Sequence, residues 1–151
     1  MAIDLELLGQ ALKRAQYRNH RTMDAALRAA GVSLVQWDAL RAIDQAPGAS
    51  AHDLAVATFQ SDQSFGTLAT RLIDRGLVER MPGRGRRLEH ALTPAGVDAL
   101  AAGRVVAAAE LPALFAPLDE SQRAALFDAL TSLTDRAESA SDPADGARSR
   151  A

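Results

Sequence analysis

Apolar residues recur at steps of three and four along most of this chain, which is the spacing of one face of a helix. Serine, threonine or aspartate stands at the start of most of these stripes, and glycine or proline stands near their ends, as is typical of helix boundaries. The stripes predict helices over Leu5 to Ala30, Ser33 to Pro47, Ala51 to about Thr58, Ser61 to Gly76, Pro94 to about Ala116, and Asp119 through Leu133.

The stretch from Ser61 to Gly96 changes its pattern twice. After the helix, Leu77 to Met81 reads as a strand and Arg87 to Leu92 as its partner. Pro82-Gly83-Arg84-Gly85-Arg86 stands between them, and its glycines permit a tight turn. The stretch therefore predicts a helix followed by a short β-hairpin with arginines at its tip, which is the arrangement of a winged helix.

The helix before this stretch completes a second motif. Phe59-Gln60 forms a short turn between the helix that begins at Ala51 and the helix that begins at Ser61. Two helices joined by such a turn form a helix-turn-helix, and residues 61–76 take the place of its recognition helix. The fold class predicted is mainly α with a small β-hairpin wing (α+β), that is, a winged helix-turn-helix.

The terminal helices predict an oligomer. A helix as long as 5–30 needs a second surface to pack on in a chain of 151 residues, and another copy of the chain supplies one. Residues 1–32 and 94–137 are therefore expected to form a helical dimerisation region around a DNA-binding lobe over 33–93. Pro112 is expected to kink or interrupt the 94–116 helix. The polar tail, 138–151, is expected to be disordered.

Composition excludes several classes of protein. Cysteine is absent, which removes disulfides, thiol chemistry and cysteine-based zinc sites. The three histidines, at positions 20, 52 and 90, lack the spacing of metal ligands. No apolar run reaches the roughly 20 residues of a membrane span, and the N-terminus lacks the features of a signal peptide. We therefore expect a cytoplasmic protein with no metal site, no cofactor and no membrane partner.

Charge is distributed unevenly, although the net charge is only −2. Residues 80–87 contain four arginines and no acid, whereas the acids lie mainly on the predicted helices and in the tail. Arginines at an exposed turn tip favour contact with DNA phosphates over the alternative of a merely solvated hairpin.

The order of these elements resembles the MarR family of bacterial transcription regulators, over about residues 5–136. Each short motif is weakly specific by itself, but their order and spacing together are strongly specific. The similarity is carried by Leu54-Ala55, Ser61 to Ser64, Arg71-Leu72, Gly76 to Arg80, Leu92 to Gly96, Ser33-Leu34, and Gln36-Trp37 to Leu40.

The chain departs from the family pattern at two places. Gly85 replaces the aspartate of the family's Asp-Arg-Arg wing triplet, and the wing is about two residues shorter. Gly66 and Thr67 stand where members often have Thr followed by Arg or Lys. A glycine inside a helix indicates close approach of the backbone to another surface, either DNA or a neighbouring helix.

The resemblance implies a set of DNA-contacting residues on the recognition helix and the wing. Glutamine pairs with adenine edges, hydroxyls bind bases or phosphates, and arginine binds phosphates. Arg75 reaches the DNA backbone or serves only the helix C-terminus, and Arg87 faces DNA or pairs with an acid of the hairpin. The set is Ser61, Gln63, Ser64, Thr67, Arg71, Arg84, Arg86 and Arg87.

The resemblance also implies a small-molecule site, because relatives often bind aromatic acids between the dimer helices and the DNA-binding lobe. The candidate lining combines aromatic rings with cations. Each member has an ordinary explanation: Trp37 lies on an apolar stripe and suits the core, and His20 suits solvent or a dimer interface. The candidate pocket comprises Tyr17, His20, Arg21, Trp37 and Arg41.

Two functions are therefore weighed. The first is a homodimeric, sequence-specific, ligand-responsive DNA-binding regulator, usually a repressor in this family, on a palindromic operator. The second is a winged-helix module that binds protein, which the acidic net charge and the weak basicity at Thr67 permit. No phosphate-binding loop, nucleophile motif or clustered acid pair points to an enzyme.

Overall fold

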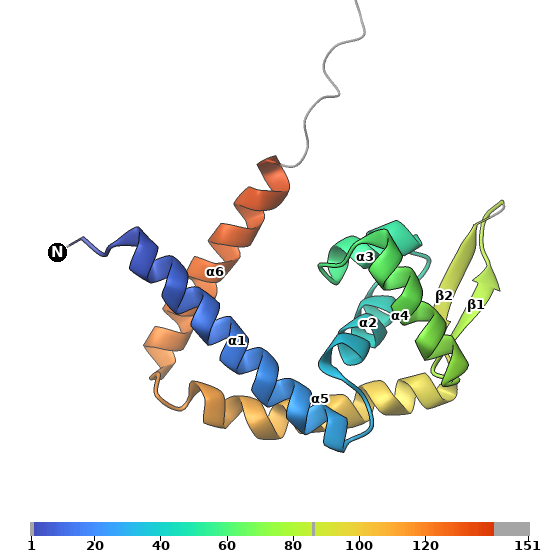
Figure 1. Ribbon diagram of the computed structural model, residues 1–151, viewed down its shortest axis with the longest axis horizontal. Helices are drawn as coiled ribbons and strands as arrows, with labels where there is room; N and C mark the ends of the chain where they lie inside the picture. The colour runs from blue at the N-terminus through green and yellow to red at the C-terminus, as the bar shows by residue number, and fades with distance from the viewer. Residues whose placement is uncertain (1, 86, 141–151) are drawn as a thin grey trace, which may run out of the picture. The chain divides into compact units, whose positions relative to one another are not determined.

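The computed structural model of the protein describes residues 2–85 and 87–140, with side chains up to residue 135. This part contains six α-helices and one antiparallel hairpin, so the fold is mainly helical with a small β-hairpin, as predicted (Figure 1). The elements are α1 (Leu5–Ala29), α2 (Leu34–Gln45), α3 (Ala51–Ala57), α4 (Asp62–Asp74), β1 (Val78–Pro82), β2 (Leu88–Leu92), α5 (Pro94–Phe115) and α6 (Glu120–Ala140).

The chain divides into two compact units at the boundary between Leu111 and Pro112. This boundary falls inside α5, but the helix continues through Pro112 to Phe115. Of the two expectations for Pro112, the interruption of the helix is therefore wrong, and the kink stays a prediction. Pro112 lacks the N–H that would bond the carbonyl four residues earlier, so the helix loses one hydrogen bond there, but the backbone stays helical up to Phe115.

The helix starts follow the predicted caps. The Ser33 and Ser50 hydroxyls each accept a hydrogen bond from the backbone amide three residues later. The side chains of Gln36 and Asp53 in turn accept a hydrogen bond from the backbone amide of the cap residue. Thr93 Oγ1 accepts from the Gly96 amide, at 3.1 Å. Asp119 forms the corresponding box with Gln122. These reciprocal bonds satisfy amides that a helix start otherwise leaves unpaired, which explains why the sequence placed the helix starts correctly.

The core of the first unit is formed by the inner faces of its helices. Its largest fully buried side chains include Leu27 of α1, Leu40 of α2, Leu54 of α3 and Leu72 of α4. Trp37 is only 6 % exposed, and its Nε1 donates to the carbonyl of Leu100 at 3.2 Å. The ordinary explanation of Trp37 as a core residue is therefore confirmed.

The hairpin projects from this core beside α4 (Figure 1). Its register pairs Val78 with Leu92 and Pro82 with Leu88, so both strands begin one residue later than predicted. The Gly83 amide closes the turn by donating to the Arg87 carbonyl at 2.8 Å. Gly85 has a φ of +68°, a conformation that glycine adopts without strain.

In the second unit, α6 runs to Ala140 and so includes the first three residues of the segment predicted to be disordered. The rest of that segment, 141–151, lies outside the described residues.

Candidate nucleic-acid interface

The recognition helix α4 has one buried face and one exposed face. Phe65, Leu68 and Leu72 are buried, as predicted, and Phe65 is only 1 % exposed. The polar residues of the predicted DNA-contacting set lie on the opposite face of the helix or at its start, and all are exposed. They are Ser61, Gln63, Ser64, Thr67 and Arg71.

The hydrogen bonds at the start of α4 show which polar side chains hold the helix together and which remain free to bind another molecule. Ser61 Oγ accepts from the Ser64 amide at 3.1 Å and lies 2.9 Å from the Ser64 hydroxyl, so Ser61 is the helix cap. Thr67 Oγ1 donates to the Gln63 carbonyl at 3.1 Å. Within the described residues, the Gln63 side-chain amide forms no hydrogen bond. Gln63 therefore presents an unused donor and acceptor at the exposed end of the helix.

Gly66 lies on the exposed side of the same helix. No other part of the described chain lies within 4 Å of the position that a Cβ would occupy there. Close packing against a neighbouring helix is therefore wrong as an explanation of this glycine. The open backbone leaves room for another molecule to approach α4 closely.

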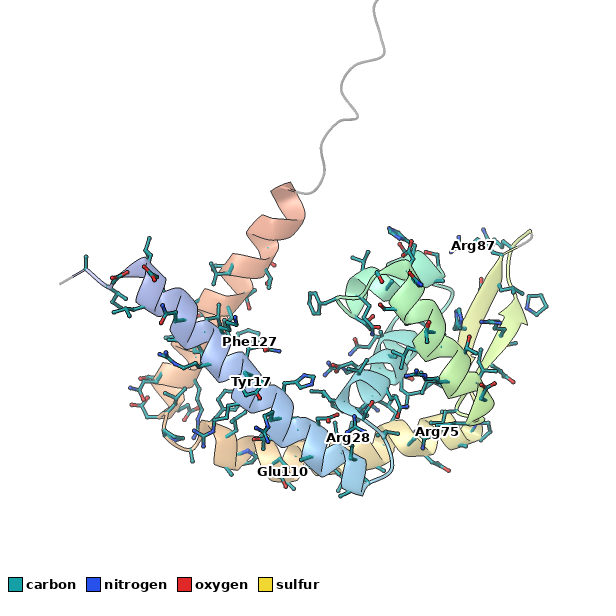
Figure 2. All side chains as sticks on the ribbon, viewed as in Figure 1. Tyr17, Arg28, Arg75, Arg87, Glu110 and Phe127 are labelled. Carbon is teal, nitrogen blue, oxygen red and sulfur yellow. The ribbon has the colours of Figure 1, made fainter. Side chains whose placement is uncertain are left out.

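The wing contributes arginines with different surroundings. Arg84 is exposed in the turn. Arg87 is also exposed, and its Nη2 reaches the Gly48 carbonyl in the turn between α2 and α3, at 3.5 Å (Figure 2). Arg87 thus links the wing to that turn and does not pair with an acid of the hairpin. Arg86, the other predicted wing contact, lies outside the described residues.

The wing is also packed against the recognition helix. The ring of His90 on β2 meets the ring of Phe65 edge to face, with centroids 5.9 Å apart. Burial, assisted by the charge of Arg80, lowers the pKa of His90 and so favours the neutral form of the ring. Because an apolar contact joins β2 to α4, the hairpin and the recognition helix present one continuous surface.

Arg75 at the C-terminal end of α4 holds the helix in place (Figure 2). Its guanidinium donates to Gln36 Oε1 at 2.9 Å and to the Gly31 carbonyl at 2.6 Å. Arg75 therefore connects the end of the recognition helix to the α1–α2 turn. From the sequence, Arg75 was expected either to contact the DNA backbone or to stabilise only the C-terminus of its own helix. The bridge to the α1–α2 turn is a third role, which the sequence did not predict.

Two features of this surface escaped the sequence analysis. His52 in the first turn of α3 pairs with Asp62 in the first turn of α4, with Nδ1 and Oδ1 2.9 Å apart. Phe59, in the turn between these helices, is 94 % exposed and has a φ of +56°. The two residues lie on different helices, so the period of neither helix could predict the pair. A phenylalanine carries no sequence signal for positive φ, which usually selects glycine.

The candidate ligand pocket is brought together only in part. The guanidinium of Arg21 lies 5.8 Å from the centre of the Tyr17 ring, and Tyr17 is 60 % exposed. On α2, Arg41 lies 4.8 Å from the centre of the Trp37 ring and forms an ion pair with Asp38 at 2.7 Å. The charge of His20 acts on Asp38, which places His20 near this second pair.

A hollow of about 250 Å³ lies beside the Arg41 pair. Of the five predicted pocket residues, only Arg41 lines it, together with residues of α2 and of the α3–α4 turn. Burial raises the pKa of Asp38 in this hollow, and the charge of Arg41 opposes the shift. The full lining is Asp38, Arg41, Ala42, Gln45, Ala46, Ala57, Thr58 and Phe59.

Two further properties hold for the described part of the chain. No group of three or more histidine, aspartate or glutamate side chains is arranged to hold a metal ion there. No single helix among those residues has the length and apolar content needed to cross a membrane, and only the bent pair α5 and α6 passes that test when taken together.

Comparisons with known proteins agree with this geometry. The sequence model of the MarR family matches residues 30–88, whereas no curated protein sequence matches significantly. The structure of the MarR family protein Rv2887 of Mycobacterium tuberculosis with salicylic acid is 29 % identical, with a TM-score of 0.70 over 83 % of this chain and 95 % of that one.

The transcriptional repressor CouR is similar in two states. Its complex with a 23-mer DNA duplex is 26 % identical, with a TM-score of 0.79 over 89 % of this chain and 99 % of CouR. Its complex with p-coumaroyl-CoA is 28 % identical, with a TM-score of 0.76 over 85 % and 92 %. Residues 30–88, which include the helix-turn-helix and the first strand of the wing, thus match the MarR family, and the fold of the chain is similar to those of MarR family DNA-binding transcription regulators.

Proposed function

We propose that the protein is a homodimeric, sequence-specific transcriptional repressor that binds a palindromic operator and releases it when a small aromatic acid binds. The observation that carries this proposal is the exposed polar face of α4, which the hairpin extends through the contact between Phe65 and His90. CouR, a repressor of similar structure, occurs bound to a DNA duplex. The protein would act in the cytoplasm, where its DNA lies.

The start of α4 reads the bases in this proposal. Gln63 carries the unused amide and faces outward, so it pairs with a base edge, most simply adenine, in the major groove. Ser64 and Thr67 stand on the same exposed side and contact bases or phosphates. Ser61 contributes mainly as the cap that fixes this turn, and Arg71 reaches the DNA backbone one turn further along.

The wing arginines supply affinity. Arg84 and Arg86 contact phosphates or the minor groove beside the helix, and Arg87 contacts a phosphate while its link to Gly48 holds the wing. Such contacts carry little sequence information, but they set the register of the protein on the duplex.

The proposed dimer is supported by apolar side chains that each unit leaves exposed. In the first unit, Leu5 of α1 is 79 % exposed, and Leu8 and Leu12 lie exposed one and two turns further along. In the second unit, Phe127 of α6 is 70 % exposed, and Leu133 is exposed as well. Burying these side chains against a second copy would remove a large apolar area from water. The two recognition helices would then read half-sites roughly 10 bp apart.

An aromatic acid is proposed as the ligand because the α1 and α2 pairs combine rings with guanidinium groups. Tyr17 with Arg21, and Trp37 with Arg41, offer a π surface and a positive charge side by side. His20 acts electrostatically on Asp38, the ion-pair partner of Arg41. The complexes of Rv2887 with salicylic acid and of CouR with p-coumaroyl-CoA support this class of ligand.

In vitro selection from a random pool of DNA duplexes, followed by gel shift at moderate salt, tests the DNA-binding function. We expect a palindromic duplex that binds at least about 10³-fold more tightly than unrelated DNA. Salicylate added to the complex should lower that affinity if the ligand proposal holds. Enrichment of no sequence, with only non-specific binding, would favour the protein-binding module instead.

A further inference from the structure

The pair formed by His52 and Asp62 lies on the surface that is proposed to face DNA. Both side chains are largely exposed, at 68 % and 70 % respectively, and the His52 Nδ1 lies 2.9 Å from the Asp62 Oδ1. Asp62 is the first residue of α4 and directly precedes Gln63 and Ser64. The pair therefore stands at the end of the recognition helix that is proposed to enter the groove.

The charge of Asp62 matters at this place. A carboxylate suits the N-terminus of a helix, but it repels the phosphates of an approaching duplex. A protonated imidazole at 2.9 Å cancels that charge, whereas a neutral imidazole leaves it in place. The protonation of His52 thus decides whether the start of α4 carries a net negative charge.

The other charged groups near His52 are few. Its hydrogen bond with Asp62, followed by the charges of Asp62 and Asp53, raises the pKa of His52. Asp53 belongs to α3 itself and is acted on in turn by Arg87 of the wing.

The ionisable groups of α2, which also packs on α3, have partners of their own. Asp38 pairs with Arg41 at 2.7 Å, and Asp44 pairs with Arg104 at 3.1 Å. Asp62 is therefore the principal partner of His52.

We propose that His52 is a positioning and charge-setting residue that neutralises Asp62 at the start of the recognition helix, so that DNA binding weakens as His52 loses its proton. This inference rests on the proposed DNA-binding function and adds a pH dependence to it. DNA favours the protonated pair, because the protonated pair has no net charge to oppose the phosphates. Affinity is therefore highest at low pH, and it falls as the pH rises through the raised pKa of His52, that is, above pH 6.5.

The test measures the affinity of the full chain for the selected duplex between pH 6 and pH 9 at constant salt. For the wild type we expect affinity to fall by about two- to fivefold per recognition helix over this range. His52→Gln keeps a polar partner for Asp62 but cannot carry charge, so its affinity should be low and flat with pH. Asp62→Asn removes the carboxylate, so it should still bind tightly at pH 9, and any remaining pH dependence should move to lower pH together with the lowered pKa of His52.

Asp74→Asn serves as the matched control, because it removes one carboxylate from the opposite end of the same helix. It should retain the wild-type pH dependence. A His52→Gln variant with the wild-type pH dependence would overturn the inference while leaving DNA binding intact. Absence of specific binding in every variant and at every pH would instead contradict the proposed function. In the free protein, NMR titration should show a lower pKa for His52 in Asp62→Asn.

Discussion

At the residue scale, three helical glycines of this chain differ in how much space surrounds them: two are tightly packed and one is open. A Cβ at Gly96 would overlap the backbone carbonyl of Leu77, and one at Gly103 would overlap the Trp37 ring. These two glycines are required by close packing within the first unit, between the first part of α5 and the residues Leu77 and Trp37. Gly66 faces open space on the exposed side of α4, so its own fold does not require a glycine there.

Replacing Gly66 with alanine should therefore stabilise the protein by about 0.5–1 kcal/mol, because alanine loses less backbone entropy in a helix. Urea unfolding measures this change. Gly96→Ala is the matched control and should destabilise by roughly 1–3 kcal/mol through overlap with Leu77. If Gly66→Ala also weakens DNA binding, the backbone of α4 approaches DNA closely. Destabilisation by Gly66→Ala would contradict the open environment.

At the element scale, the recognition helix is held near both of its ends by neighbouring elements. Its C-terminal end is tied by Arg75 to the α1–α2 turn, and its N-terminal part contacts the wing through Phe65 and His90. The wing is in turn linked by Arg87 to the α2–α3 turn. A rigidly held α4 can present Gln63 and Thr67 in a fixed orientation, which specific recognition of bases requires.

Arg75→Ala should lower the free energy of unfolding by about 1–2 kcal/mol, because it removes two hydrogen bonds from a charged donor. Arg71→Ala, one turn earlier on the same helix and exposed, should change stability by less than about 0.5 kcal/mol. Thermal and urea unfolding compare the two variants. If the two variants have the same free energy of unfolding, the hydrogen bonds of Arg75 to Gln36 and Gly31 do not stabilise α4.

The wing gives a second prediction at this scale. Arg84→Ala should weaken binding to all duplexes by a similar factor, because a phosphate contact adds affinity without reading sequence. The slope of log affinity against log salt should fall by about one for each phosphate that the variant no longer neutralises. Arg14→Ala removes an exposed arginine from α1 and should leave that slope unchanged. If Arg84→Ala binds DNA with wild-type affinity and slope, the assignment of the wing tip is wrong.

At the scale of the whole molecule, the exposed leucines of α1 and the exposed phenylalanine of α6 distinguish these helices from the buried faces of α2 and α4. Exposed apolar side chains at regular helical spacing indicate a surface that a partner covers. In the proposed dimer, covering these side chains sets the distance between the two recognition helices. Sequence-specific affinity would therefore depend on residues that never contact DNA.

Leu8→Glu or Phe127→Glu should shift the protein to a monomer at micromolar concentration, because each change places a charge in the proposed interface. Sedimentation velocity measures the shift, and affinity for the palindromic duplex should fall by at least about tenfold. Val56→Glu, an exposed apolar position on α3, should leave the oligomeric state unchanged. A wild-type protein that is monomeric under these conditions would contradict the dimer.

The sequence alone predicted much of the fold, because the relevant signals are local. Caps such as Ser33 and Thr93 fix helix starts through bonds to amides three residues away, and the spacing of Phe65, Leu68 and Leu72 separates buried from exposed faces. The exposed face of α4 was predicted for the same reason. Which of its residues contact DNA stays a prediction.

Tertiary structure decided the contacts between residues that no period relates. The pairing of His52 with Asp62, the bridge from Arg75 to Gly31 and the link from Arg87 to Gly48 all depend on how elements pack together. The separate surroundings of Tyr17 and Trp37 were likewise invisible in the order of residues. A helix period specifies which side of an element is buried, whereas packing alone specifies which charged side chains meet across elements.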